Sequence, residues 1–380
     1  MTFTLTRLLY SRDEVEYSLI NSLLEKKNIS ECYFWSCELY YSDKNDENRI
    51  FELIWKIYFD FYAIYNPGLE KYIQKKEKNW NLSRELNIII FIVYNLFQCN
   101  ISSDVFLLRQ YTYQKKESLI MYKVKGKKWD WLNDFPASYR SFVIAIHKKH
   151  IANATVILYN LVKHRDIKEI YNILIRYYSK SVALKTPELM ETTWRNRHWK
   201  DNFHSLLALM LHLETPIDKI TYPLVLKQPS RKTIERLKQH NIDIIDRHDN
   251  CDRVYRILSD FRTYTINKMV GVFKLNRYSV SNFKQECRNR WEYYANNSFI
   301  WRERIQRFNG EIKSKYVVFP ETAKEENDFY DRYGLELDEQ SHDTQMQSLC
   351  DIDEFSIEDW HNKIFVFPSI VKLDGIVETY

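Results

Sequence analysis

Residues 47–66, ENRIFELIWKIYFDFYAIYN, decide the fold class of this chain. On an α-helix, Glu52, Lys56 and Asp60 fall at i, i+4 spacing and form one narrow polar stripe. Almost every other residue from position 50 to position 65 is large and apolar or aromatic. A helix that is apolar over so much of its circumference must be surrounded by other elements. We therefore expect these residues to form the central helix of an all-helical N-terminal domain.

The composition of the whole chain also favours helices. Six Gly and eight Pro in 380 residues are too few for a β-sandwich with many tight turns. The six Cys are scattered without a C-x-x-C pair, which excludes a zinc ribbon or a dithiol motif and, without a signal peptide, indicates free thiols in a reducing compartment. The longest apolar run, residues 88–97, is too short to cross a bilayer, so we expect no membrane partner.

Two short blocks of the sequence resemble each other. Residues 23–33 align with residues 161–171, each block lies between two amphipathic helices, and each second helix runs into Tyr-Tyr-Ser at 40–42 or 177–179. A recurring helical hairpin is typical of stacked α-repeats, although chance similarity in a chain biased towards Tyr, Ile, Asn and Lys is the alternative. We predict an all-α, α-solenoid-like array of helical hairpins.

The helix ends can also be read from the sequence. Ser11 and Glu14 have the spacing of a capping box that begins the first helix. Ser30 follows a short break and predicts the cap of the second helix, and Gly310 fits the position just after a helix over residues 298–308. The aspartates at 243, 246, 249 and 252 predict a polar linker between two further helices.

Charge divides the chain into three predicted domains. Residues 321–380 hold 16 Asp and Glu against 4 Lys and Arg, a net charge of −12, which leaves +17 for the remainder of a chain whose total is +5. We expect a helical-hairpin repeat domain at 1–184, a basic helical domain at 185–319 and an acidic segment at 320–380. A basic body with an acidic tail indicates a polyanionic partner with which the tail competes, or else a solvated surface.

The acidic segment itself is predicted in three parts. The first is an acidic helix over residues 321–333 that Gly334 ends. The second is an extended or disordered tether over residues 335–359. The third is a short strand within residues 363–373, KIFVFPSIVKL, that serves as an edge strand or a docking peptide.

Nucleotide-binding loops are excluded, because no two glycines lie within eight residues of each other. The sharpest enzymatic alternative is His248-Asp249, a dipeptide of metal-dependent His-Asp phosphohydrolases, with His212 or His240 upstream and Asp260 downstream as further ligands. The same dipeptide is common by chance. We therefore expect no catalytic residue, no metal site and no cofactor.

Basic residues interleaved with tryptophans make a stronger case. Lys and Arg neutralise phosphates and exposed aromatic rings stack on unpaired bases, so this combination predicts a surface for single-stranded nucleic acid. The tryptophans themselves are expected to pack in the core. The predicted nucleic-acid-binding residues are Lys125, Lys127, Lys128, Arg195, Arg197, Lys200, Arg288, Arg290, Arg302, Arg304 and Arg307.

Four stretches resemble a known family: residues 38–42 (ELYYS), 53–63 (LIWKIYFDFYA), 328–334 (DFYDRYG) and 338–341 (DEQS). They are similar to a conserved protein of the nucleocytoplasmic large DNA viruses, the mimivirus-like giant viruses and their relatives, over residues 5–347. The resemblance implies a viral function in the host cytoplasm or viral factory and supplies no catalytic residues.

We expect a non-enzymatic helical scaffold that binds viral or host proteins and RNA or DNA, resembling at the level of fold the large scaffold subunit of a cap-binding translation initiation complex. A structural component of the virion is the alternative.

Overall fold

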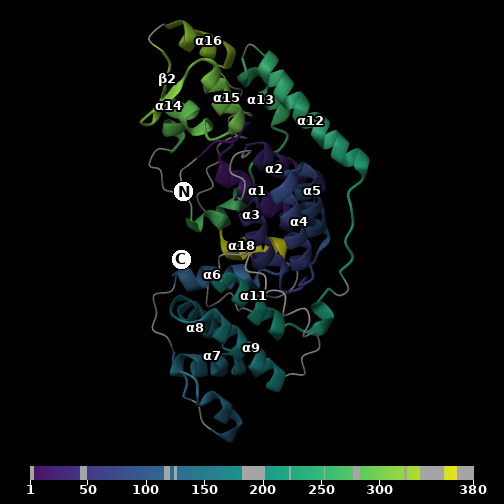
Figure 1. Ribbon diagram of the computed structural model, residues 1–380, viewed down its shortest axis with the longest axis vertical. Helices are drawn as coiled ribbons and strands as arrows, with labels where there is room; N and C mark the ends of the chain where they lie inside the picture. Colours follow the sequence, from purple (N-terminus) through teal and green to yellow (C-terminus); the bar gives the residue numbers. More distant parts are fainter. Residues whose placement is uncertain are drawn as a thin grey trace. The chain divides into compact units, whose positions relative to one another are not determined.

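The fold is that of a computed structural model in which residues 4–42, 49–114, 120–123, 126–181, 202–221, 224–251, 253–276, 283–320, 323–333 and 355–365 are described. The predicted all-α class is confirmed (Figure 1). Within the described residues, the only sheet is an antiparallel pair, β1 (Glu311–Lys313) and β2 (Tyr316–Val318), in which Ile312 is opposite Val317.

The chain forms two compact units, and each is built from separated parts of the sequence. The first comprises Met1–Leu53, Ser83–Phe97 and Lys227–Trp360, and the second comprises Ile54–Leu82, Gln98–Leu226 and His361–Tyr380. This division differs from the three consecutive domains predicted from charge. Compact units form where apolar faces pack together, and the net charge of a segment does not show which faces those are.

The elements of the first unit are α1 (Arg12–Glu25), α2 (Ile29–Ser42), α5 (Leu86–Gln98), α12 (Arg231–Asn250), α13 (Tyr255–Phe261), η4 (Lys268–Asn276), α14 (Phe283–Ala295), α15 (Phe299–Arg307), β1, β2 and α16 (Ala323–Tyr333). The elements of the second unit are the π-turn η1 (Tyr58–Tyr62), α4 (Leu69–Ser83), α6 (Asp104–Gln114), η2 (Lys127–Leu132), α7 (Ala137–His147), α8 (Ile151–His164), α9 (Ile167–Ser181), α11 (Asn202–Glu214) and η3 (Ile217–Lys219). Helices α3 (Arg49–Ile57) and α18 (Ile357–Ile364) contain residues of both units, and the last residues of α4 and α5, Ser83 and Gln98, belong to the other unit than the rest of their helices.

The two predicted hairpins are present as α1–α2 and α8–α9, and the helices of each pack against each other. The second helix of each hairpin begins after an aligned residue, Asn28 or Asp166. The side-chain oxygen of Asn28 accepts a hydrogen bond from the backbone N–H of Ser30 at 2.9 Å, and the carboxylate of Asp166 accepts one from the backbone N–H of Lys168 at 2.9 Å. The cap of α2 is therefore Asn28, two residues before the predicted Ser30. A similar cap depends only on the residues at the start of each helix, so it does not establish a repeat. The solenoid-like array therefore stays a prediction.

The first helix begins after Ser11 as predicted, but the capping box does not form. The side chain of Ser11 accepts no bond from the helix, and the amide of Glu14 donates to the carboxylate of Asp13 at 2.9 Å. A carboxylate in the first turn serves the unpaired amides as well as the predicted hydroxyl would.

The central stretch is surrounded by other residues, as predicted, but it is not one straight helix. Helix α3 ends at Ile57 and the chain continues as the π-turn η1, in which all five residues are buried. A π-turn adds a residue to the helical turn and rotates the following side chains. Glu52 stays exposed, whereas Asp60, predicted on the same polar stripe, is 1% exposed.

Asp60 is buried because two helices of the second unit supply partners. Its carboxylate accepts bonds from Arg109 on α6, at 3.0 and 2.8 Å, and lies 2.5 Å from Nε2 of His204 on α11. Burial raises the pKa of the Asp60 carboxyl, but Arg109 and His204 outweigh it and hold the pKa below its ordinary value. The ion pair thus fixes η1 between α6 and α11 in the core of this unit.

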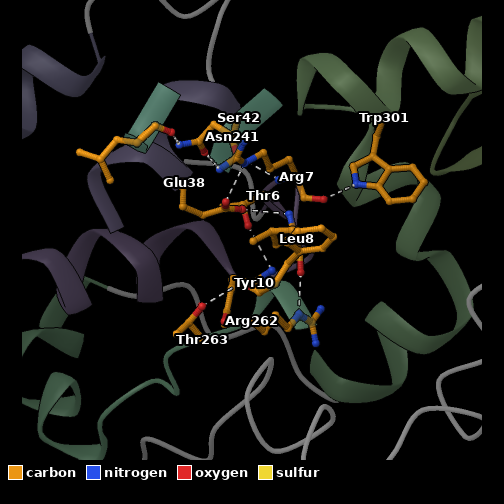
Figure 2. A network of polar contacts seen from close by, with 12 residues as sticks. Thr6, Arg7, Leu8, Tyr10, Glu38, Ser42, Asn241, Arg262, Thr263 and Trp301 are labelled. Carbon is orange, nitrogen blue, oxygen red and sulfur yellow. Dashed lines mark hydrogen bonds and ion pairs between the residues drawn. The ribbon is translucent and has the colours of Figure 1, made fainter. Parts of the chain in front are cut away.

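The first unit is built around an N-terminal segment that is buried although it is polar (Figure 2). Arg7 donates from its backbone to Ser42 at 2.9 Å and from Nε to Glu38 at 2.8 Å. Its carbonyl accepts the indole N–H of Trp301 at 3.0 Å, and the carbonyl of Leu8 accepts Arg262 Nε at 2.7 Å. Residues distant in sequence therefore converge on two peptide groups near the N-terminus.

The beginning of the predicted acidic domain is part of the core of the first unit. Helix α16 covers the predicted helix and ends before Gly334, but Phe329 and Tyr333 are fully buried in it. Phe329 stacks on Trp291 of α14 with ring centroids 6.3 Å apart, and Tyr333 meets the edge of Trp301 of α15 at 6.0 Å. Only the outer face of this helix is acidic.

Two other predictions near the C-terminus have different outcomes. The predicted tether lies mostly outside the described residues, and its last three residues, 357–359, are the first residues of α18. Lys363 and Ile364, expected to start a strand, are the last residues of α18, and the rest of that predicted strand lies outside the described residues.

The predicted linker around residue 246 is also wrong, because α12 continues without interruption to Asn250. Asp243 and Asp246 are exposed on its outer face, while Asn241, Ile244 and His248 form its buried face. Carboxylates on the solvent side of a long helix do not end it when the opposite face has apolar and hydrogen-bonded contacts.

Candidate nucleic-acid interface

Among the described residues, the segment around η2 is a predicted basic and aromatic cluster whose lysines lie at the surface. The turn follows Gly126, whose φ of +100° is a conformation that favours glycine. Trp129 and Leu132 are buried and anchor the turn, whereas Lys127 and Lys128 are exposed and Trp131 is half-buried. The turn thus holds one tryptophan in the core and presents the other.

Trp131 is contacted by two cations from another helix. The guanidinium carbon of Arg176 lies 5.1 Å and the ammonium of Lys180 lies 5.2 Å from its ring centroid. Both residues belong to α9 and are four apart, so they share one helix face. Each cation–π contact at an exposed site contributes about 0.5–1 kcal/mol, enough to orient the side chains without desolvating their charge.

Trp129 connects the turn to the end of α7. The ring of His147 meets its edge with centroids 4.9 Å apart, and the ammonium of Lys128 lies 5.1 Å from its centroid. The pKa of His147 is lowered by partial burial and then by the charges of Lys128 and Lys149. These side chains therefore stand in a field of positive potential.

We call this surface the Trp131 patch and define it as Lys127, Lys128, Trp131, His147, Arg176 and Lys180. Exposed carboxylates are also present on the same segment, at Asp130 and Asp134. The carboxylate of Glu169 accepts a hydrogen bond from the Tyr139 hydroxyl at 2.6 Å, and that of Glu214 accepts one from the Tyr178 hydroxyl at 2.5 Å. These two carboxylates therefore have partners outside the patch. The cations of the patch outnumber its exposed carboxylates.

The predicted arginines of the first unit are engaged in packing. Arg290 donates to the Tyr316 hydroxyl at 2.7 Å, Arg302 to the Asn296 carbonyl at 3.2 Å, and Arg307 to the Tyr333 hydroxyl at 3.0 Å. Each guanidinium therefore already has an acceptor within its own fold, although Arg307 is exposed and can also face solvent.

Arg304 requires a correction, because its side chain is 1% exposed. It bonds to Asp249 at 3.2 Å, and its guanidinium lies 4.6 Å from the Trp301 ring centroid. A buried, paired arginine does not reach a phosphate at the surface, so we remove Arg304 from the predicted interface. Trp129, Trp291 and Trp301 are buried, which confirms the expectation that these tryptophans pack in the core.

The remaining predicted positions are not placed as side chains. Lys125, Arg195, Arg197 and Lys200 lie outside the described residues, and Arg288 is described only as part of the α14 backbone.

Sequence reasoning missed Arg176 and Lys180, which lie about 45 residues after the turn that they contact. Their spacing of four on a helix was visible, but nothing in the sequence pairs α9 with η2.

Of the residues of the phosphohydrolase alternative, His240 and His248 both lie against the ring of Phe261, with ring centroids 6.2 and 5.6 Å apart, whereas the other candidates have other partners. Asp249 is paired with Arg304 and Asp260 with Arg247 at 2.8 Å, and His212, in the other compact unit, is bonded to the Ile64 carbonyl at 2.7 Å. Within the described ranges, no group of three His, Cys, Asp or Glu side chains is arranged to hold a metal ion.

The sequence matches no protein-family model, and comparisons with curated proteins and with solved structures give no match. Among the described helices, none is both long enough and apolar enough to cross a membrane. The site's geometry is therefore the basis for assigning a function.

Proposed function

We propose that this protein is a non-enzymatic helical scaffold of a giant DNA virus that binds single-stranded RNA through the Trp131 patch. The observation that carries the proposal is the half-exposed ring of Trp131 with two cations of α9 beside it, on a turn whose Lys127 and Lys128 are exposed. An aromatic ring beside several cations offers a base a stacking surface and its flanking phosphates a counter-charge.

The scaffold part of the proposal rests on the architecture and on the resemblance to the viral family. Packed helical hairpins offer extended surfaces to partner proteins, and the resemblance places those partners among viral or host proteins in the cytoplasm or viral factory. In this proposal the acidic C-terminal segment competes with RNA for the patch.

Fluorescence anisotropy with a labelled single-stranded RNA tests the patch. The double variant Arg176→Glu/Lys180→Glu should weaken binding at least tenfold, because it replaces two cations beside Trp131 with anions. The matched control is Arg165→Glu/Lys168→Glu, which makes the same change of charge on two exposed residues, one just before α9 and one in its first turn. Equal loss in both variants would show that only net charge matters and would contradict a defined patch.

Competition by the acidic segment is tested separately. Removing everything after residue 320 would delete the buried Phe329 and Tyr333, so truncation there would disrupt the first unit. Replacing Glu336, Asp338, Glu339 and Asp343 with the corresponding amides should instead tighten RNA binding several-fold. Unchanged affinity would exclude competition by these four residues without bearing on the patch.

A further inference from the structure

A short segment of the second unit, residues 120–123 (Ile-Met-Tyr-Lys), contacts helices α7 and α8 and is not part of the Trp131 patch. Its backbone is fixed at two points. The backbone N–H of Tyr122 donates to the hydroxyl of Ser141 on α7 at 2.8 Å, and the side chain of Asn153 on α8 donates to the carbonyl of Ile120 at 3.1 Å. The other three side chains of the segment are exposed. The helices therefore hold this segment in place at the surface.

The ring of Tyr122 is half-buried and has two basic side chains beside it. The ammonium of Lys148 lies 5.0 Å from the ring centroid, and the Tyr122 hydroxyl lies 2.6 Å from Nδ1 of His150. Both basic residues are exposed and belong to the turn between α7 and α8. The arrangement resembles that of Trp131, which is also a half-buried ring beside two basic side chains of another element.

A series of contacts connects Tyr122 to the Trp131 patch. The ring of His147, a member of the patch, meets the edge of Trp129, which lies two residues before Trp131 in η2. Lys148 is the next residue after His147, and its ammonium lies over the ring of Tyr122. All of these residues belong to the second unit. Trp131 and Tyr122 are thus the two ends of one connected set of side chains, with basic residues between them.

The charge of this connection is mainly positive. Neither the segment nor the turn between α7 and α8 contains an Asp or Glu, and Asp130 of η2 is an exposed carboxylate nearby in the sequence. Lys149 is paired with Glu214 of α11, so we do not count its charge. Lys128 and Lys148 lie beside aromatic rings, at 5.1 and 5.0 Å from the centroids, and both are exposed. Exposed lysines of this kind can neutralise phosphates.

We propose that Tyr122 is a second base-stacking position of the RNA surface, so that the ligand is a single strand long enough to reach both Tyr122 and Trp131. The inference rests on the proposed function and adds the length of strand that the protein requires. Each ring stacks on one base, and Lys128 and Lys148 neutralise phosphates between the two bases. Because every base has a π-face, stacking tolerates any base, and the surface selects unpaired strands by their length and not by their sequence.

Fluorescence anisotropy of the full chain with labelled oligouridylates of three and twelve nucleotides, at low salt, tests the second position. Tyr122→Ala should weaken binding of the longer strand by at least about fivefold, because one stacked base is lost. It should change binding of the shorter strand by less than about twofold, because a strand that reaches one ring gains nothing from the other. Tyr122→Phe keeps the ring and should bind both strands as the wild type does.

Two further variants make the test specific. Met121→Ala is the matched control, because it truncates the exposed neighbour of Tyr122 without removing a ring, and it should leave both affinities unchanged. Lys148→Ala, at an exposed position, keeps the ring and should make the slope of log K against log salt concentration shallower by about 1 for the longer strand. Circular dichroism establishes which variants fold, and either Tyr122→Ala or Lys148→Ala alone suffices.

The outcomes separate this inference from the proposed function. Binding of the longer strand that depends on Trp131 but is unaltered in Tyr122→Ala and Lys148→Ala would overturn the second position and leave the Trp131 patch intact. Equal loss of both strands in Tyr122→Ala would also contradict it, because a second position matters only to a strand that reaches it. Absence of RNA binding by the wild type at low salt would overturn both proposals.

Discussion

At the scale of single residues, the core depends on charges that are buried in pairs. Asp60 in the second unit is held by Arg109 and His204, and Arg7 in the first unit is held by Glu38. Buried ion pairs contribute little net stability compared with apolar residues, but loss of one partner leaves the other charge uncompensated.

Asp60→Asn should therefore be severely destabilising. The amide cannot balance Arg109, and we expect a loss of about 3–5 kcal/mol in the free energy of unfolding. Urea denaturation followed by circular dichroism measures it. The control is Glu52→Gln, an exposed carboxylate on the same stretch, which should change stability by less than about 0.5 kcal/mol. Similar effects of the two substitutions would contradict a structural role for the Asp60 pair.

His248 gives a prediction with a definite sign in pH. Its pKa in the folded protein is lowered, so below about pH 6.5 the unfolded chain binds a proton that the folded chain does not. Stability should therefore fall as the pH drops from 7 to 5, and His248→Gln should reduce that slope. A variant with the same slope as the wild type would show that other groups cause the loss.

At the scale of elements, helix ends show what the sequence can and cannot specify. Gly310 was predicted at the position just after α15, but Asn309 holds that position in the left-handed conformation, with φ of 57°, and Gly310 comes next. Its amide bonds to the carbonyl of Ile305 at 2.9 Å, while that of Asn309 bonds to Gln306 at 3.0 Å, which is a Schellman motif. The sequence indicated that a glycine-containing motif ends the helix. Which of the two residues takes the left-handed conformation depends on the packing of Gly310 against Phe319.

Substitutions at these two residues should act in opposite directions. A Cβ at Gly310 would lie 2.7 Å from Ile305 Cγ2 and 2.9 Å from Phe319 Cε1, so Gly310→Ala should cost about 1–3 kcal/mol of stability. Asn309→Gly should be neutral or stabilise by up to about 1 kcal/mol, because glycine adopts positive φ without strain. Thermal unfolding of both variants checks this, and a harmless Gly310→Ala would contradict the close packing.

The π-turn shows why elements were predicted better than side-chain positions. Periodicity predicted residues 47–66 to be helical and surrounded by other elements, and the described residues 49–62 form α3 and η1 and are mostly buried. The same periodicity placed Asp60 on an exposed stripe, because a one-residue expansion of the helix depends on the distant partners Arg109 and His204. The Trp131 patch has the same limit, since its α9 cations meet η2 only through the tertiary fold.

At the scale of the whole molecule, the helical class followed from composition and patterning, whereas the division into units did not. Residues 83–97 belong to the first unit and residues 98–226 to the second. Such interleaving arises from which faces pack, and no shift in charge or composition marks it. Charge did identify a basic surface at η2, but it also assigned Arg304 to the surface, because a buried arginine and an exposed one look alike in sequence.

The salt dependence of single-stranded RNA binding tests the central claim most directly. Binding through the Trp131 patch predicts that log K falls linearly with log salt concentration, and that Arg176→Glu/Lys180→Glu makes the slope shallower by about 1–2. Trp131→Ala should weaken binding by about 1–3 kcal/mol while keeping the slope, because stacking is lost and the charges remain. No binding at low salt, or affinity that is independent of both salt and Trp131, would contradict the account.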